Sequence, residues 1–105
     1  MNVTIYQIKE NTKSVMFLFR GWERVKDFFN FKNYKKVWSG TFENLVDEIP
    51  ENTNDKLDVI FNIFNIHHPK NFRGHSLSTS DIVKLDNEYF FCDSFGWENV
   101  TNKIN

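Results

Sequence analysis

Three residues with the chemistry of a hydrolase stand close together in the second half of the chain. His75, Ser76 and Asp81 fall within a stretch of seven residues. A nucleophilic serine needs a histidine within hydrogen-bond reach to take its proton and a carboxylate to orient the ring. No strand-to-helix elbow presents this serine, and Ser78 and Ser80 compete with it. Because serine and aspartate before a strand more often bond to turn backbone, the pattern favours a structural role.

The same loop predicts a polar network. Pairing of the two strands that follow would place Asp93 and Ser94 at the open end of a hairpin, beside His75 and Asp81. Buried polar groups need partners, so we expect these four side chains to hold the loop together. A carboxylate-histidine site for acid-base or metal chemistry is the alternative that the residues leave open.

Few residues of the chain could bind a metal ion or act as a reactive thiol. His67, His68 and His75 are the three histidines of the chain, and three imidazoles can ligate zinc. Adjacent histidines at a helix end seldom reach one ion, however, and Cys92 is the single cysteine. Within an aromatic strand this cysteine is expected to behave as a small apolar residue. No glycine-rich phosphate loop is present, so we expect no catalytic residue, no metal site and no cofactor.

A β-hairpin must position this loop. Two runs rich in β-branched and aromatic residues, 82–85 and 89–92, flank Asp86 and Asn87, which tolerate positive φ. With these two residues as the turn, Val83 lies opposite Phe90. Both faces of the hairpin then carry large apolar side chains, so we expect it inside a sheet that is packed on each side.

Helical periodicity marks two further segments. Residues 54–65 space apolar side chains at i, i+3, i+4 and i+7, with Asn54 as the expected N-cap. Residues 22–29 show a shorter amphipathic pattern, whereas residues 14–19 leave strand and helix open. The polar tail, residues 98–105, is expected to fray.

Together the segments predict an α+β fold, a small mixed or antiparallel sheet of about four strands with two main helices packed on it. The expected strands are 2–8, 34–42, 80–85 and 88–93, and the expected helices are 22–29 and 54–65. At 105 residues the chain is expected to form one domain, 1–105.

Composition indicates the cellular compartment of the protein and the class of its binding partners. A single cysteine suits a reducing cytoplasm. The N-terminal residues lack the pattern of a secretory signal, and no apolar run approaches a membrane span. We therefore expect a soluble cytoplasmic protein. The net charge of −1 argues against binding to nucleic acid over the whole surface.

The charges are unevenly distributed along the chain. Residues 13–36 hold seven basic and two acidic side chains, a local net of +5, and residues 43–58 hold one basic and six acidic, a local net of −5. Such runs are most often solvated faces, and the alternative is a basic and an acidic contact surface.

Two blocks of the sequence carry a resemblance. HPKNFRGHSLSTSDIVKL at 68–85 and EYFFCDSFGW at 88–97 are similar to the YodL-like domain family, and VTIYQI at 3–8 and YKKVWSGTFE at 34–43 extend the likeness. The resemblance implies a small α+β domain that is carried on plasmids, conjugative elements and phages, often beside genes that protect the incoming element. It implies no established reaction, so no catalytic residues are carried over.

Residues and resemblance together favour a non-enzymatic mobile-element protein. We expect it to bind and inhibit a host defence factor, such as a CRISPR effector, which is a nucleic-acid-guided nuclease, or a restriction enzyme. The acidic candidates would meet a basic nucleic-acid channel. The candidate contacts are either basic (Arg20, Arg24, Lys35, Lys36) or acidic (Asp47, Glu48, Glu51), with His68, Lys70 and Arg73 of one loop as accessories.

The alternative is a nucleic-acid-binding accessory protein of plasmid or conjugative-element maintenance. It would use the basic and aromatic run at 20–38, with cations on phosphates and aromatic rings on bases. The spacing of those aromatic residues, however, is typical of a core, and no known nucleic-acid-binding motif is present.

Overall fold

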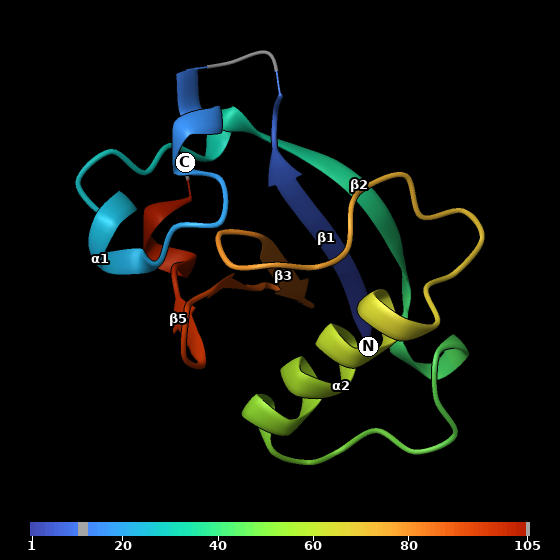
Figure 1. Cartoon of the computed structure of the whole chain (residues 1–105). Coiled ribbons are helices and arrows are strands. Elements are labelled where there is room, and N and C mark those ends of the chain that lie inside the picture. Colours follow the sequence, from blue (N-terminus) through green and yellow to red (C-terminus); the bar gives the residue numbers. More distant parts are fainter. Residues whose placement is uncertain (11–12, 105) are drawn as a thin grey trace.

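A five-stranded antiparallel sheet forms the centre of the computed structural model, which describes residues 1–10 and 13–104 (Figure 1). The strand order in this part of the chain is β2-β1-β3-β4-β5. The α+β class is confirmed, and the sheet is antiparallel throughout with one strand more than expected. The strands are β1 (Asn2–Ile8), β2 (Tyr34–Thr41), β3 (Ile82–Leu85), β4 (Glu88–Cys92) and β5 (Trp97–Asn99).

The β3–β4 hairpin has the register that the sequence predicts. Val83 pairs with Phe90, and Leu85 pairs with Glu88 across the turn. Asp86 has a φ of 51°, whereas Asn87 keeps a negative φ, so one turn residue instead of two enters the left-handed region. Both faces of the hairpin are covered, since Val83 and Ile82 belong to two different core clusters.

Helix α2 (Thr53–Ile66) covers one face of the sheet. Its buried residues Leu57, Ile60 and Phe64 belong to the same core cluster as Val3 and Ile5 of β1. The expected cap Asn54 is wrong, because the Asn52 side chain accepts the hydrogen bond from the Asp55 backbone N–H at 3.1 Å. The helix consequently begins at Thr53, one residue earlier than predicted.

The opposite face is covered by short elements, which lie on the other side of β1 from α2 in Figure 1. They are η1 (Lys13–Phe17), α1 (Trp22–Val25) and η2 (Phe31–Asn33). The predicted helix 22–29 is wrong beyond its first turn. Phe28 turns outward, 67% exposed, and stacks on Phe17, while Phe29 packs on Phe91 of the sheet. No single helical face satisfies both contacts.

The C-terminal segment is ordered into the sheet, so the prediction of a frayed tail is wrong. β5 pairs with β4, and η4 (Thr101–Lys103) follows it. Val100 is 1% exposed and donates its backbone N–H to Tyr89 at 2.8 Å. The outer edge of β4 supplies this pairing, which stabilises a segment with little local preference for a strand.

Candidate functional site

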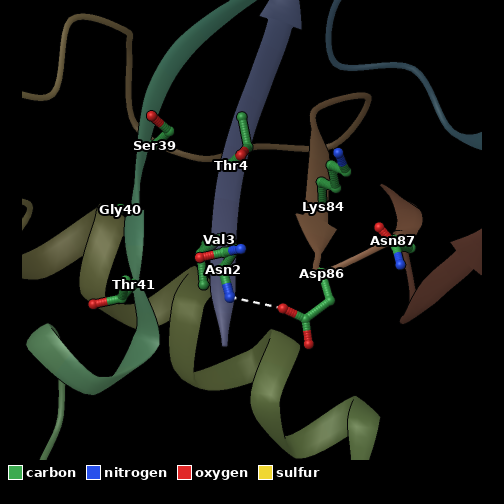
Figure 2. A pocket seen from close by; sticks show the side chains of 9 residues that line it. All are labelled: Asn2, Val3, Thr4, Ser39, Gly40, Thr41, Lys84, Asp86 and Asn87. Atoms are coloured by element: carbon green, nitrogen blue, oxygen red, sulfur yellow. Dashed lines mark hydrogen bonds between the residues drawn. The ribbon is translucent and has the colours of Figure 1, made fainter.

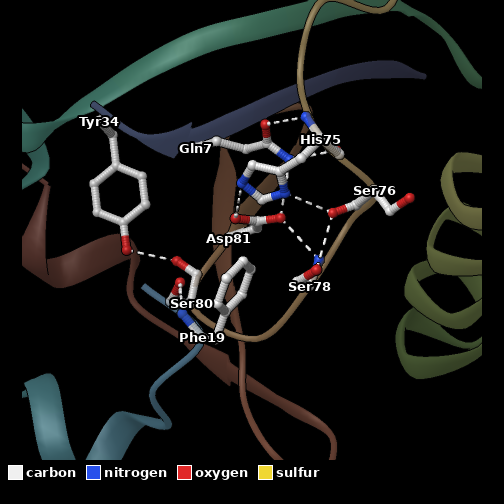
Figure 3. Close-up of polar contacts among 8 residues, drawn as sticks. All are labelled: Gln7, Phe19, Tyr34, His75, Ser76, Ser78, Ser80 and Asp81. Atoms are coloured by element: carbon white, nitrogen blue, oxygen red, sulfur yellow. Dashed lines mark hydrogen bonds and ion pairs between the residues drawn. The ribbon is translucent and has the colours of Figure 1, made fainter. Parts of the chain in front are cut away.

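A buried polar cluster joins β1 to the loop that precedes β3 (Figure 3). This polar node consists of Gln7, His75, Ser78 and Asp81. Val3, Ile5 and Gln7 alternate onto one face of β1, and the loop at 74–81 lies against the end of that face. Gln7 and Asp81 are both buried, and Asp81 is 0% exposed.

The Gln7 side chain clamps both ends of the loop. Its Nε2 donates to the His75 carbonyl at 2.9 Å and to Asp81 Oδ2 at 3.0 Å, and its Oε1 accepts from the His75 backbone N–H at 3.1 Å. Asp81 Oδ2 also accepts from the Ser78 backbone N–H at 2.8 Å. A Cβ atom at Gly74 would collide with Gln7 Oε1, so the approach requires glycine there.

His75 and Asp81 face each other within the polar node. His75 Nδ1 lies 2.7 Å from the Ser76 carbonyl and 3.3 Å from Gln7 Nε2. His75 Nε2 and Asp81 Oδ1 lie 3.9 Å apart, and neither buried atom has a hydrogen-bond partner among the described residues.

Burial favours the uncharged form of the carboxyl. Loss of hydration raises the pKa of Asp81 well above its usual range, although the bonds from Ser78 and Gln7 act in the opposite direction. The uncharged carboxyl can still accept the bonds from Ser78 and Gln7, so the polar node fixes the loop without a buried charge.

The serine hydroxyls do not face the ring nitrogens. Ser78 Oγ donates to the Ser76 carbonyl at 2.9 Å, and Ser80 Oγ accepts from the Phe19 backbone N–H at 3.1 Å. His75 Nδ1 faces the Ser76 carbonyl and not a serine hydroxyl. The geometry of a serine nucleophile, histidine and aspartate is therefore not assembled here.

Asp93 and Ser94 lie outside the node, so the expected network of four residues is right only for His75 and Asp81. Asp93 Oδ1 accepts from the Trp22 backbone N–H at 3.0 Å and from the Ser94 backbone N–H at 2.8 Å. The carboxylate thus bonds to the first residue of α1, where backbone N–H groups lack helical partners. The loop after β4 is thereby fixed to the segment before α1.

Gln7 of the polar node and the neighbouring Tyr34 were not predicted from the sequence. Gln7 carried one signal, since it follows Val3 and Ile5 in the buried register of β1. No sequence pattern pointed to Tyr34. Its hydroxyl donates to the Ser80 carbonyl at 2.6 Å, and burial raises the pKa of Tyr34. Burial also raises the pKa of Cys92 to about 12, as expected for a thiol packed as an apolar residue.

The candidate contact residues are all exposed. Arg20 and Arg24 flank the start of α1, Lys35 and Lys36 lie on the edge strand β2, and the acidic candidates lie between η3 (Phe42–Asn44) and α2. None of the ten belongs to an ion pair within residues 1–10 and 13–104. The same described ranges contain no group of three His, Cys, Asp or Glu side chains that could hold a metal ion.

A shallow groove of about 660 Å³ lies on the sheet face opposite α2, at the end that α1 does not cover (Figure 2). Pairing across the strands places Ser39, Thr4, Lys84 and Tyr89 in one row on this face. At the end of the groove, Asp86 Oδ1 accepts from the Asn2 backbone N–H at 2.8 Å. The groove is lined by Asn2, Val3, Thr4, Ser39, Gly40, Thr41, Lys84, Asp86 and Asn87.

Comparison with protein-family models decides the family. Residues 2–102 match the model of the YodL-like domain. The chain belongs to the YodL-like domain family. The uncharacterized protein R785 of Acanthamoeba polyphaga mimivirus is 36% identical over 90 residues, which cover 73% of this chain and 79% of that protein. No solved structure matches the YodL-like chain.

The YodL-like domain also exposes large apolar side chains on two segments. Met16, Phe19 and Phe28 are exposed in the segment around α1, and Phe95 is 95% exposed on the loop between β4 and β5. The Asp93 bond to Trp22 fixes this loop beside that segment.

Across the described parts of the chain, no helix has the length and apolar character needed to cross a membrane.

Proposed function

We propose that this YodL-like domain is a non-enzymatic mobile-element protein that binds and inhibits a host defence factor, either a CRISPR effector or a restriction enzyme. A relative encoded by a virus supports the mobile-element part of this proposal, since the match covers most of both chains. Steric inhibition requires affinity for a partner and no reaction. The relevant features are therefore surfaces that a partner protein could cover.

The observation that carries the proposal is the exposure of three phenylalanines and one methionine, Phe19, Phe28, Phe95 and Met16, which together are called the aromatic patch. An exposed phenylalanine gains free energy when a partner removes it from water, and aromatic residues and arginine are enriched at the centres of interfaces. Phe95 projects next to Gly96, which has a φ of 78°. Its attachment through Asp93 to Trp22 limits the entropy lost when a partner binds.

The charges around the aromatic patch indicate the chemistry of the partner. Arg20 and Arg24 are exposed and belong to no ion pair with any described residue. We infer that the partner surface carries carboxylates around apolar pockets, so that the arginines steer the encounter. The acidic patch (Asp47, Glu48, Glu51) is the second candidate contact, and it would suit the basic nucleic-acid channel of a defence nuclease.

A plasmid-protection assay tests the proposal. Bacteria that carry one defined CRISPR effector or one restriction system receive a targeted plasmid, with or without the expressed protein, and transformants are counted. We expect protection by the wild type and its loss in a Phe19→Ser, Phe95→Ser double variant. Ile66→Ser is the matched control, because Ile66 is also exposed but lies at the end of α2. Failure of the wild type against every system in a panel would contradict the proposal.

The alternative function, a nucleic-acid-binding accessory of plasmid maintenance, is favoured by the exposed lysines of β2 and by the row of side chains in the groove. A gel shift that is lost on replacing Lys35 and Lys36 by glutamate would support it. The groove also suggests a more specific binding mode, which the next subsection develops.

A further inference from the structure

One half of a sheet face is covered and the other half is open. Near α1, the face opposite α2 is covered by aromatic side chains that pack on Ile8, Ile82 and Phe91. Four residues back along β1, Thr4 lines the groove together with Lys84 of the neighbouring strand. Figure 2 shows the Thr4 and Lys84 side chains on adjacent strands beside Ser39.

We propose that this open half of the sheet binds a single strand of nucleic acid, with phosphates on Lys84 and Lys36. The proposal does not depend on inhibition of a defence factor. It assigns to the groove a ligand that is anionic, flexible and able to hydrogen-bond along its length.

The cations are available for such a ligand. Lys36 pairs with Tyr6, so it belongs to the same sheet face as the row through Thr4 and Lys84. Neither lysine has a carboxylate partner in the described part of the chain. Ideal strand spacing puts the Cα atoms of the two lysines about 12 Å apart, which is close to the span of two nucleotides.

One acidic side chain lies at the end of the groove, where it keeps its negative charge. Asp86 is the single carboxylate among the groove-lining residues, and its Oδ1 accepts from the Asn2 backbone N–H. It lies in the turn after β3, beyond the row that carries Lys84. The row itself, together with Lys36, therefore offers two positive charges and no negative charge to a phosphate backbone.

The remaining members of the row suit nucleosides better than a protein surface. Ser39 and Thr4 provide hydroxyl groups, which can bond to bases or sugars on a flat surface. Lys84 Nζ lies 5.2 Å from the centroid of the Tyr89 ring, which also contacts Tyr6 and Phe31 at the border of the covered half. A nucleotide whose phosphate meets Lys84 would place its base next to Tyr89. The large exposed apolar side chains that anchor protein interfaces lie elsewhere, in the aromatic patch.

Two phosphate contacts set a quantitative expectation. For a single strand, the logarithm of the association constant falls with the logarithm of salt concentration at a slope of about −0.7 per contact, giving about −1.4 for two lysines. A tenfold increase in salt should therefore weaken binding about 25-fold. Loss of one lysine should halve the slope to about −0.7.

Fluorescence anisotropy with labelled oligo(dT) and oligo(U) of about 15 nucleotides provides the test, in salt from about 20 mM to about 200 mM. We expect Lys84→Gln and Lys36→Gln each to weaken binding and to halve the salt slope, and Tyr89→Leu to weaken binding about fivefold. Lys70→Gln is the control, because Lys70 is exposed on a loop that does not line the groove.

Three outcomes would overturn the proposal. The first is no change in anisotropy for the wild type at the lowest salt. The second is unaltered affinity in Lys36→Gln, which changes an exposed side chain and should leave the fold intact. The third is equal loss in the Lys70→Gln control, which would indicate binding without a defined site. A circular dichroism melt of each variant separates loss of binding from loss of folding.

Discussion

Replacing Asp81 by alanine removes the acceptor on which two buried donors depend. The Ser78 backbone N–H and Gln7 Nε2 both bond to Asp81 Oδ2, at 2.8 and 3.0 Å. A buried donor left without a partner costs about 1–3 kcal/mol. We therefore expect Asp81→Ala to lower the free energy of unfolding by about 3 kcal/mol, or the melting temperature by about 12 °C.

Asparagine at this position separates the hydrogen bonds from the charge. Its carbonyl can accept from the same two donors, and its amide is uncharged, as the protonated acid is. We expect Asp81→Asn to lower the free energy of unfolding less than Asp81→Ala does near neutral pH, because the Ser78 and Gln7 donors keep an acceptor.

The pH dependence of the two proteins should differ in a defined direction. Burial raises the pKa of Asp81 in the folded protein above its ordinary value of 3.8. The folded state therefore binds this proton more tightly than the unfolded state does. The associated stability is fully present below pH 3.8 and is lost as the pH rises through the folded pKa. Asparagine cannot titrate, so Asp81→Asn should gain stability relative to wild type over that rise.

Urea unfolding followed by circular dichroism, at pH values from about 4 to about 8, measures this difference. Asp47→Asn serves as the control, because Asp47 is an exposed carboxylate and its replacement should leave the pH dependence nearly parallel to wild type. If Asp81→Asn proves as unstable as Asp81→Ala at every pH, the node requires a charged carboxylate. That result would refute the assignment of an uncharged Asp81 carboxyl in the folded protein.

Three further changes test separate parts of the structure. Val100→Ala should lower the free energy of unfolding by about 2 kcal/mol in a urea titration, because Val100 is 1% exposed in the second core cluster. Gly74→Ala should lower the melting temperature more than Gly96→Ala, since a Cβ at Gly74 collides with Gln7, whereas Gly96→Ala has only the strain of a positive φ and meets nothing within 4 Å. Alanine at the acidic patch (Asp47, Glu48, Glu51) should weaken plasmid protection without changing the melting temperature; unchanged protection would remove this patch from the candidates.

Local patterns predicted the elements that depend on local energetics. The β3–β4 register follows from alternating apolar residues and a two-residue turn, so it could be read within a dozen residues. The apolar spacing of α2 likewise identified the buried residues Leu57, Ile60 and Phe64. Its cap was misplaced because Asn52 and Asn54 are both good capping residues, and only the observed bond to Asp55 distinguishes them.

Segments with weak local preference were assigned incorrectly. The spacing of apolar residues in 22–29 is typical of a helix, but the rings of Phe28 and Phe29 pack in different directions. β5 gains its stability from the free edge of β4 and from burial of Val100, neither of which is visible in its polar sequence. Tertiary contacts decided both segments.

The α+β class, the hairpin, the long helix and the membership of the YodL-like family follow from the residues alone, because each rests on periodicity or on residue order within short blocks. The surroundings of the reactive residues depend on long-range contacts. Gln7 lies 68 residues from His75 and 74 from Asp81 in the chain, and no spacing rule connects them. Burial of Asp81 favours its uncharged form, and pairing of four strands creates the open row beside Lys84.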